Sequence, residues 1–341
     1  MGDAMADIQN IKNIGIVGRG AIGVNIALYL QSADNIKTTL LIRDHYNRSD
    51  RLSLSTPDAK IHTIKCKQAH ISESSLKQLD MIILPVKQYQ IEGLLQEIAE
   101  KLDPKTTILL LHNGMGGIEL VQMYLPNNPL LVATTTDGVY KTSPTCFVQT
   151  ASGQLDIGVI YNKRTKQESN YKESTDEKST DEKSTDEKNM LENHDVPKWD
   201  YVNCLHPHLV WHTDIVVSLY QKLAVNAAIN PLTALKNCKN GELVNYSKDV
   251  SRIKEEIFDL FEFMNLALDN HALSLHIDAV IQLTKENYSS MHQDFQNGRE
   301  TEVEGILGFL LAKGQETGMK MAYVQQLYEQ IKQHPYNNKK A

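Results

Sequence analysis

Short apolar runs alternate with amphipathic stretches from residue 13 to about residue 211. Buried strands of a parallel sheet read as continuous apolar runs, whereas the helices that cover them show one apolar face. The alternation therefore predicts a doubly wound α/β fold with a mostly parallel sheet. The predicted strands are residues 14–17, 39–42, 81–84, 108–111 and 130–133, with residues 154–160 and 209–211 as antiparallel strands at the far edge.

The pattern changes after Asp214, where strand signals almost vanish. Windows 253–268 and 277–295 have apolar residues at helical spacing, and Phe258, Phe261, Met264 and Leu268 in particular recur every three or four residues. Such spacing places apolar side chains on one face of a helix, where they can form a core. We therefore expect two domains, an α/β domain over residues 1–212 and an all-helical domain over residues 213–341.

A charged, low-complexity segment lies near the end of the first domain, at about residues 163–198. It contains three tandem Ser-Thr-Asp-Glu-Lys repeats, which start at Ser174, Ser179 and Ser184. A mixed-charge tract with almost no apolar residues cannot offset the entropy of ordering its chain. We interpret it as a disordered surface insertion in a hairpin between edge strands.

Composition narrows the class of protein. The 341 residues are 41% hydrophobic and 23% charged with a net charge of -7, which is typical of a globular chain and argues against nucleic acid as a partner. The four cysteines form no C-x-x-C motif, as expected of a reduced cytosolic protein. The first ten residues do not resemble a secretion signal, and no apolar run reaches the ~18 residues of a membrane span. We expect a cytoplasmic protein.

A glycine motif directly follows the first predicted strand and opens an amphipathic helix: Gly18, Arg19, Gly20, Ala21, Ile22 and Gly23. In this context the glycines permit a tight turn, close approach of the backbone to a pyrophosphate and close helix–strand packing, as in a Rossmann-type dinucleotide site. The next strand ends at Arg43, whose guanidinium matches the 2′-phosphate of NADP(H) better than the ribose hydroxyl of NAD. Asp44 is the competing residue, and Arg43 as a plain surface charge is the alternative.

Lys222, Asn226 and Asn230 are spaced four residues apart in the second domain. On a helix this spacing forms one stripe that can converge on a small polar ligand, although a solvated helix face is the plain alternative. Reduction of a ketone needs a proton donor at the carbonyl oxygen, and Lys222 is our candidate. Glu302 is its candidate partner, because it stands near the predicted start of a helix that follows the helix stop at Gly298.

Three further residues leave alternatives open. Pro231 predicts that the lysine helix kinks or ends there, which would push the Asn230 amide into the site. Asn240, before Gly241, is either a source of another amide or a plain turn residue. Ser290 lies in a helical stretch and is equally ambiguous.

Four segments in matching order and spacing then carry a resemblance: residues 14–23, residues 112–116, residues 222–234 running on to 240–243, and residues 289–294 with 301–302. On these the chain resembles the ketopantoate reductase (2-dehydropantoate 2-reductase) family through nearly its whole length. The resemblance implies NADPH-dependent reduction of 2-dehydropantoate to (R)-pantoate, a step toward pantothenate and coenzyme A.

The resemblance also implies site roles. Lys222 is similar to the family's general acid and Glu302 to the acidic residue that completes the site. Arg43 fits its NADP-selecting arginine. Asn226, Asn230, Asn240, Ser290 and Asn113 are similar to the substrate-binding groups. Lys87, Asn113 and Glu302, with Arg43 and the glycine motif, form the implied cofactor set. Arg19 departs from the small residue expected there, and it either contacts a phosphate or points to solvent.

Rival interpretations remain. Cys204, His206, His208 and His212 crowd one stretch as in a zinc site, but Pro207 separates two of them and hydride transfer needs no metal, so we expect none. A non-catalytic NADP-binding sensor would not require Lys222 and Glu302. Another branched 2-oxo acid would use the same chemistry, and the sequence does not decide between the two substrates. We expect the small-molecule site in a cleft between the domains, which would close on the cofactor, and a homodimer is one possible assembly.

Overall fold

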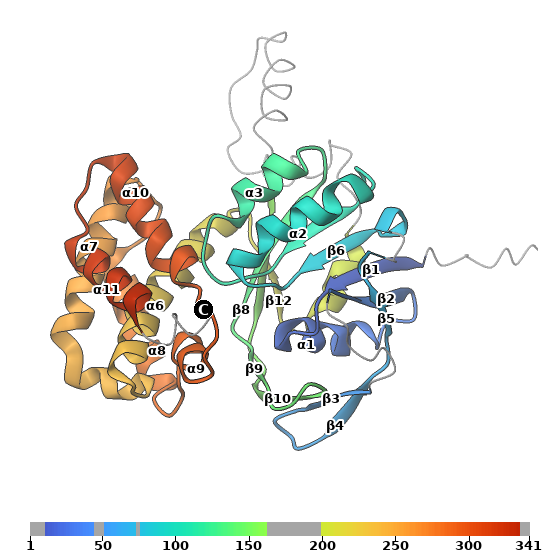
Figure 1. Cartoon of the computed structure of the whole chain (residues 1–341), viewed down its shortest axis with the longest axis horizontal. Coiled ribbons are helices and arrows are strands. Elements are labelled where there is room, and N and C mark those ends of the chain that lie inside the picture. Colours follow the sequence, from blue (N-terminus) through green and yellow to red (C-terminus); the bar gives the residue numbers. More distant parts are fainter. Residues whose placement is uncertain (1–10, 44–50, 73–75, 162–198, 335–341) are drawn as a thin grey trace, which may run out of the picture.

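The structure is a computed structural model that describes residues 11–43, 51–72, 76–161 and 199–334. Two lobes lie side by side (Figure 1). Residues 11–43, 51–72, 76–161 and 199–211 form the sheet lobe, and residues 215–334 form the helical lobe. The predicted insertion at 163–198 falls outside the described residues.

An eight-stranded sheet forms the centre of the sheet lobe. Its strands are β1 (Lys12–Val17), β2 (Ile36–Ile42), β5 (Lys67–His70), β6 (Met81–Leu84), β7 (Thr107–Leu110), β8 (Leu130–Thr135), β11 (Leu155–Ile160) and β12 (Leu209–Trp211). Their order is β12-β11-β8-β7-β6-β1-β2-β5. The pairs from β5 to β8 are parallel, β11 is antiparallel to β8, and β12 is parallel to β11. The predicted parallel sheet with two reversed edge strands is therefore confirmed.

Both faces of this sheet are covered. Helix α1 (Ala21–Leu30) lies on one face, and α2 (Ile91–Ile98) and α3 (Gly117–Tyr124) lie on the other (Figure 1). The side chains of β6 therefore alternate between two cores. Met81 and Ile83 belong to the core under α1, whereas Ile82 and Leu84 belong to the core under α2 and α3. Short 3-10 helices complete the lobe: Leu76–Gln78, Gln88–Gln90, Ala99–Lys101 and Asp200–Leu205.

A second, four-stranded sheet was not predicted. It consists of β3 (Leu52–Ser55), β4 (Ile61–Ile64), β9 (Gly138–Lys141) and β10 (Cys146–Ala151), in the order β4-β3-β10-β9. All four strands contact α1, and β3 and β10 pair although some 90 residues separate them. Strands of four to six residues with mixed polarity carry little periodic signal, so the sequence did not reveal them. Edge strand β5 was missed for the same reason.

The helical lobe surrounds one long helix, α6 (Ile215–Lys236), which contacts α7, α8, α9 and α11. The other helices are the 3-10 helix Asn240–Tyr246, α7 (Ser247–Phe263), α8 (Asn270–Leu283), α9 (Ser290–Gln296), the π-helix Glu304–Gly308, α10 (Phe309–Thr317) and α11 (Ala322–Gln333). The all-helical character is confirmed. None of the described helices is long and apolar enough to cross a membrane.

The observed helix limits differ from the sequence pattern in three places. Window 277–295 is not one helix, because α8 ends at Leu283 and α9 begins at Ser290. Helix α7 stops at Phe263 rather than near residue 268, and Asn265 follows with a φ of 51° in the left-handed region. Of the two effects predicted for Pro231, the end of the helix is wrong, because α6 runs on to Lys236. Local patterns did not predict these limits because packing decides where such helices end.

Candidate active site

The glycine motif lies where β1 meets α1. Gly18 has a φ of +86°, which a residue with a side chain adopts only under strain. A Cβ on Gly23 would lie 3.1 Å from both Ile16 and Pro85, so the missing side chain allows the helix to pack close to the sheet. Gly20 caps the helix without a side-chain hydrogen bond. The first-turn N–H groups have no partner within the helix and suit a phosphate.

The side chain of Arg19 does not point to solvent. Its side chain is buried, and Nη2 donates to the carbonyl of Pro144, 3.4 Å away between β9 and β10. The solvent-exposed alternative is wrong, because the second sheet, which the sequence did not reveal, covers the side chain.

Arg43 directly follows β2, at the carboxyl end of the sheet where a Rossmann-type fold holds the ribose of a dinucleotide. Its Nε lies 3.1 Å from Oε2 of Glu97 on α2, and the guanidinium is partly exposed. This ion pair uses Nε, so the two terminal nitrogens of Arg43 can still donate hydrogen bonds to another anion. Asp44, the competing residue, lies outside the described residues.

Lys222, Asn226 and Asn230 all lie on α6, as their spacing predicts. The Lys222 Nζ atom donates to the carbonyl of Thr135, 2.8 Å away at the end of β8 in the other lobe. Burial lowers the pKa of Lys222 to about 8, and the negative charge of Glu302 opposes that shift. Asn226 is half-buried and Asn230 buried. A lysine with this pKa can carry a proton and also release it near neutral pH.

Glu302 stands immediately before the helical residues 303–317, and its carbonyl accepts from the N–H of Ile306. Its carboxylate accepts from the Gln88 N–H at 3.4 Å and from Asn113 Nδ2 at 3.5 Å, both in the sheet lobe. Burial raises the pKa of Glu302, although the charge of Lys87 and these hydrogen bonds work against the rise. Glu302 is thus a buried carboxyl group that joins the two lobes beside Lys222.

Lys87 is held by the helical lobe. Its Nζ lies 2.5 Å from Oδ2 of Asp294 and donates to the carbonyl of Glu300 at 3.2 Å. Asp294 also pairs with Arg299 at 3.3 Å, and burial raises the pKa of its carboxyl group. Sequence reasoning gave Asp294 no role, although it stands in the segment 289–294. A carboxylate four residues past the start of a short helix carries no signal of its own, so only the tertiary contact reveals it.

Two other candidates, Asn240 and Ser290, make none of the contacts between the lobes described above. Asn240 is buried at the start of a 3-10 helix rather than in a plain turn, and its Nδ2 donates to Thr284 Oγ1 at 2.9 Å. Its Oδ1 is buried without a hydrogen-bond partner, which leaves one acceptor for a ligand or a water. Ser290 is exposed as the first residue of α9, where the neighbouring Ser289 supplies the cap by accepting from the His292 N–H.

The histidine-rich stretch is organised around aspartates. His206 Nε2 lies 3.1 Å from Asp137, and His212 Nε2 lies 2.6 Å from Asp156. Within residues 11–43, 51–72, 76–161 and 199–334, no group of three or more His, Cys, Asp or Glu side chains could hold a metal ion. These histidines are therefore hydrogen-bond donors to carboxylates, and His206 and Asp137 are almost fully buried.

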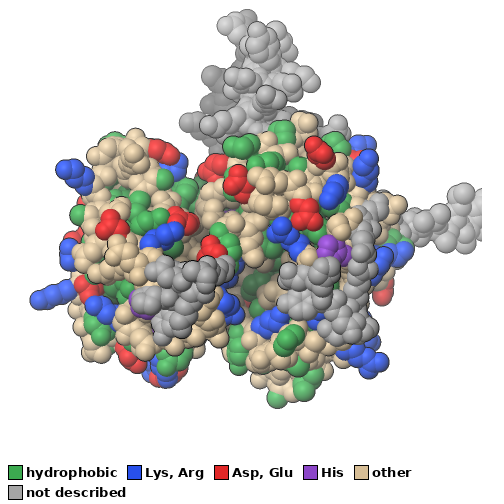
Figure 2. All heavy atoms as spheres, viewed as in Figure 1, with side chains coloured by type: hydrophobic (Ala, Val, Ile, Leu, Met, Phe, Trp, Pro, Cys, Tyr) green, Lys and Arg blue, Asp and Glu red, His purple; other side chains and the backbone are tan. Residues whose placement is uncertain are grey.

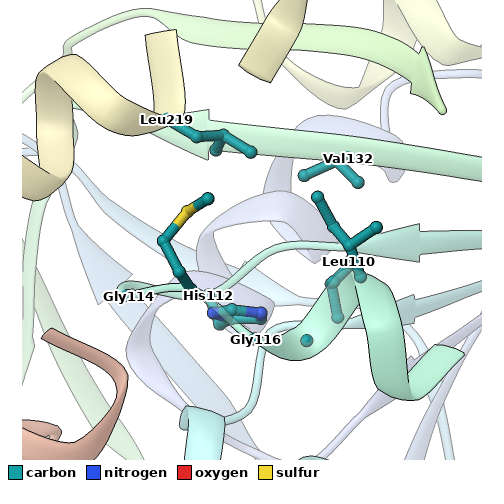
Figure 3. Close-up of a pocket in the computed structure, with 9 residues that line it drawn as sticks. Leu110, His112, Gly114, Gly116, Val132 and Leu219 are labelled. Atoms are coloured by element: carbon teal, nitrogen blue, oxygen red, sulfur yellow. The ribbon is translucent and has the colours of Figure 1, made fainter. Parts of the chain in front are cut away.

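A small cavity is lined by His112, Gly114 and Gly116 of the loop after β7 and by Leu110, Val132 and Leu219 (Figure 3). Its volume of about 10 Å³ has room for about one water molecule and not for a substrate. His112 lines it, and burial lowers the pKa of this histidine to about 4, so the ring is neutral. Because His112 Nδ1 lies 2.8 Å from the carbonyl of Asn113, Nδ1 carries the proton. The ring thereby fixes the backbone of the loop that presents Asn113 to Glu302.

The fold and these contacts define a class of protein. A Rossmann-type sheet carries a glycine turn at the start of α1, and polar groups of the two lobes meet where the lobes are in contact, which is the arrangement of a two-domain oxidoreductase. The space-filling view shows the furrow between the lobes (Figure 2). The glycine turn and the lysine helix belong to different lobes, and Lys222 and Glu302 reach from the helical lobe to groups of the sheet lobe.

Comparison with known proteins identifies the family. Residues 14–162 match the family model described as ketopantoate reductase PanE/ApbA, and residues 214–335 match the model of its C-terminal part. The chain belongs to the ketopantoate reductase family of oxidoreductases.

Named relatives cover most of the chain. It is 29% identical over 326 residues to a 2-dehydropantoate 2-reductase of Vibrio cholerae, covering 94% of this chain and 97% of the relative. The enzyme of the same name from Yersinia pestis is 30% identical over 257 residues, 75% of each chain. A solved structure of a probable 2-dehydropantoate 2-reductase from Bacillus subtilis is 26% identical, with a TM-score of 0.70 over 94% of this chain and 99% of that one. The fold also matches D-mandelate dehydrogenase bound to NADH and anilino(oxo)acetate, at 22% identity, a TM-score of 0.76 and coverage of 94% and 97%.

Proposed function

We propose that this protein catalyses the NADPH-dependent reduction of 2-dehydropantoate to (R)-pantoate, a step of pantothenate and coenzyme A biosynthesis. The relatives that bear the name of this reaction cover nearly the whole chain. The single observation that carries the mechanism is Lys222, whose pKa is lowered to about 8 and whose Nζ is held at the meeting point of the lobes. We assign the nucleotide domain to residues 1–212 and the substrate domain to residues 213–341.

The residues of the sheet lobe fit a nicotinamide dinucleotide. The turn at Gly18, the close packing at Gly23 and the uncapped N-terminus of α1 form a cradle for the pyrophosphate. Arg43 would meet the 2′-phosphate through its terminal nitrogens, and Lys87 and Asn113 would face the cofactor from the strand ends. When bound, NADPH supplies the hydride that reduces C2 of the oxo acid.

Lys222 acts as the general acid in this proposal. Its ammonium donates a proton to the carbonyl oxygen of the substrate as C2 is reduced, which avoids a free alkoxide. The buried carboxylate of Glu302 keeps the ammonium charged until that step, because it opposes the effect of burial on Lys222. Glu302 also joins Gln88 and Asn113, so it links the proton donor to the cofactor side of the site.

The amides and hydroxyls around Lys222 would bind the polar groups of the substrate. Asn226 and Asn230 follow Lys222 along the same face of α6, and Asn113 approaches from the other lobe. Asn240 and Ser290 contribute if the substrate extends toward the start of α9. We propose a soluble, cytoplasmic enzyme that acts on a small 2-oxo acid, with a homodimer as its assembly.

The experiment that tests this function follows the loss of NADPH absorbance with purified protein and 2-dehydropantoate. Pyruvate, 2-oxoisovalerate and NADH serve as controls. Lys222→Ala should lower kcat by about 10²–10⁴-fold, as removal of a general acid does, while the affinity for NADPH stays within about threefold. Turnover of Lys222→Ala close to that of the unaltered protein would refute the mechanism. Tight NADPH binding without turnover of any oxo acid would favour a sensor.

A further inference from the structure

The carbonyl that holds Lys222 lies in a strongly constrained turn. Thr135 is the last residue of β8, where it pairs with Leu155 of β11. The N–H of Asp137 donates to Thr135 Oγ1 at 3.0 Å, so the turn from Thr135 to Asp137 closes on itself. Gly153 is also locked against this turn, because a Cβ there would lie 2.4 Å from Thr136 Oγ1. The position of the Lys222 ammonium therefore depends on this turn.

The carboxylate of Asp137 anchors the turn to three separate segments. It accepts from the N–H of Gly153 at 2.7 Å and from Asn25 Nδ2 at 2.9 Å, and His206 Nε2 approaches to 3.1 Å. Asn25 belongs to α1, the helix whose first turn faces the proposed phosphate site. A single carboxylate thus connects the phosphate-binding helix, the end of β8 and the stretch before β12.

The charge of this cluster is negative. His206 Nδ1 accepts from the N–H of His208 at 3.0 Å, so Nε2 carries the ring proton and donates it to Asp137. Burial opposes ionisation of Asp137, but the hydrogen bonds from His206 and Gly153 outweigh it and hold the pKa of Asp137 below its usual range. The side chains of Asp137 and His206 are 3% and 1% exposed, so water screens this charge little.

We propose that Asp137 is a positioning residue for Lys222: with His206 and Asn25 it fixes the turn whose Thr135 carbonyl binds the ammonium, and it adds negative charge beside that ammonium. The inference rests on the proposed role of Lys222. It uses residues that the reaction itself does not require, and it explains why His206, in the Cys204–His212 stretch, is buried against Asp137.

Other charged groups also act on Lys222, and they provide the control. Glu302 faces it from the helical lobe and Asp156 from β11, while His112, in the loop after β7, is neutral and adds no charge. Asp156 raises the pKa of Lys222 as Asp137 does, but its hydrogen-bond partners are His212 and Gln154 rather than the Thr135 turn. Asp156→Asn therefore removes a comparable charge while the anchor of the turn stays in place.

The test compares kcat for oxo-acid reduction against pH in three variants of the full chain. Asp137→Asn should lower the kcat plateau by about 10- to 100-fold, the expected effect of a misplaced catalytic group, and should shift the alkaline limb to lower pH. Asp156→Asn should shift the alkaline limb to lower pH and leave the kcat plateau unchanged. His206→Gln should lower the plateau without shifting the limb, because the carboxylate keeps its charge. KM for NADPH should change by less than about threefold in all three.

Two outcomes would overturn the inference. One is an Asp137→Asn profile identical to that of Asp156→Asn, which would reduce Asp137 to one charge among several. The other is an unchanged plateau in His206→Gln. If Asp137→Asn does not fold, as judged by circular dichroism, Asn25→Ala weakens the same anchor and must lower the plateau. An active Lys222→Ala would refute the proposed function instead, so the two failures are distinguishable.

Discussion

The Nζ atom of Lys87 lies 2.5 Å from Oδ2 of Asp294, and this ion pair joins the sheet lobe to the helical lobe. The Asp294 side chain is 8% exposed and that of Lys87 is 31% exposed. Because burial raises the pKa of Asp294 in spite of Lys87, removal of the carboxylate from water outweighs its attraction to the ammonium. The pair therefore fixes how the lobes meet and contributes little to the free energy of unfolding.

We predict that Asp294→Asn loosens the contact between the lobes with only a small change in urea stability. Small-angle scattering should give a larger radius of gyration for the variant, and the backbone amides near Lys87 should exchange faster. The unaltered protein should approach this behaviour as the pH falls through the raised pKa of Asp294, because protonation removes the ion pair. Asp58→Asn, in the exposed pair with Lys60, is the control and should change neither quantity. Equal radii for Asp294→Asn and the unaltered protein would contradict the prediction.

The pKa of Lys222 predicts the pH dependence of the reaction. The reduction needs the ammonium, so kcat should fall about tenfold per pH unit above a pH of about 8, where Lys222 loses its proton. The reverse reaction needs the free amine and should rise over the same range. Steady-state rates at saturating substrate measure both limbs. In Lys222→Arg the guanidinium stays charged, so a remaining limb near pH 8 would assign that limb to another group.

Gly114 tests how closely the lobes approach each other. Its φ is +80°, and a Cβ there would lie 2.7 Å from the carbonyl oxygen of Gly305, in the other lobe. Gly114→Ala should destabilise the protein by about 1–3 kcal/mol and lower kcat by about tenfold or more, because the neighbouring Asn113 would move. The matched control is Gly298→Ala, which has a φ of +61° but no atom within 4 Å of the added Cβ.

The control variant should lose only about 1 kcal/mol, the strain of a side chain in the left-handed region, and should keep its kcat. Urea titrations and rates measured on both variants decide the matter. Equal losses of stability and kcat at Gly114 and Gly298 would show that backbone strain, and not the contact with Gly305, explains why alanine is unfavourable at Gly114.

Arg43 and Glu97 together predict cofactor selectivity. Arg43→Ala should lower the affinity for NADPH by about 10- to 100-fold, which is the contribution of a charge-assisted hydrogen bond. The affinity for NADH should stay nearly unchanged. Glu97→Gln frees the Arg43 Nε and removes a negative charge near the proposed 2′-phosphate, so it should tighten NADPH by a few-fold. Fluorescence titration with each cofactor provides the measurement. An equal loss for NADPH and NADH in Arg43→Ala would place Arg43 outside the 2′-phosphate site.

Local features were predictable from the sequence because they depend on neighbouring residues. The glycine turn follows from torsion angles that only glycine adopts without strain, and Gly18 has such an angle. The parallel strands follow from continuous apolar runs, and the shared face of Lys222, Asn226 and Asn230 follows from the pitch of a helix. Pro231 was the exception: it lies inside α6, which runs on to Lys236 and contacts α7, α8, α9 and α11.

By itself, then, the sequence determined the two-part α/β and helical architecture, the glycine turn and the residue types available for catalysis, since periodicity and torsional limits act over a few residues. Only the tertiary structure decided which groups meet. Lys87 and Asp294 are 207 positions apart, Lys222 and the Thr135 carbonyl 87, and His206 and Asp137 69. Each of these contacts depends on the packing of whole helices and strands, and no local pattern encodes which distant partner that packing will bring within hydrogen-bond distance.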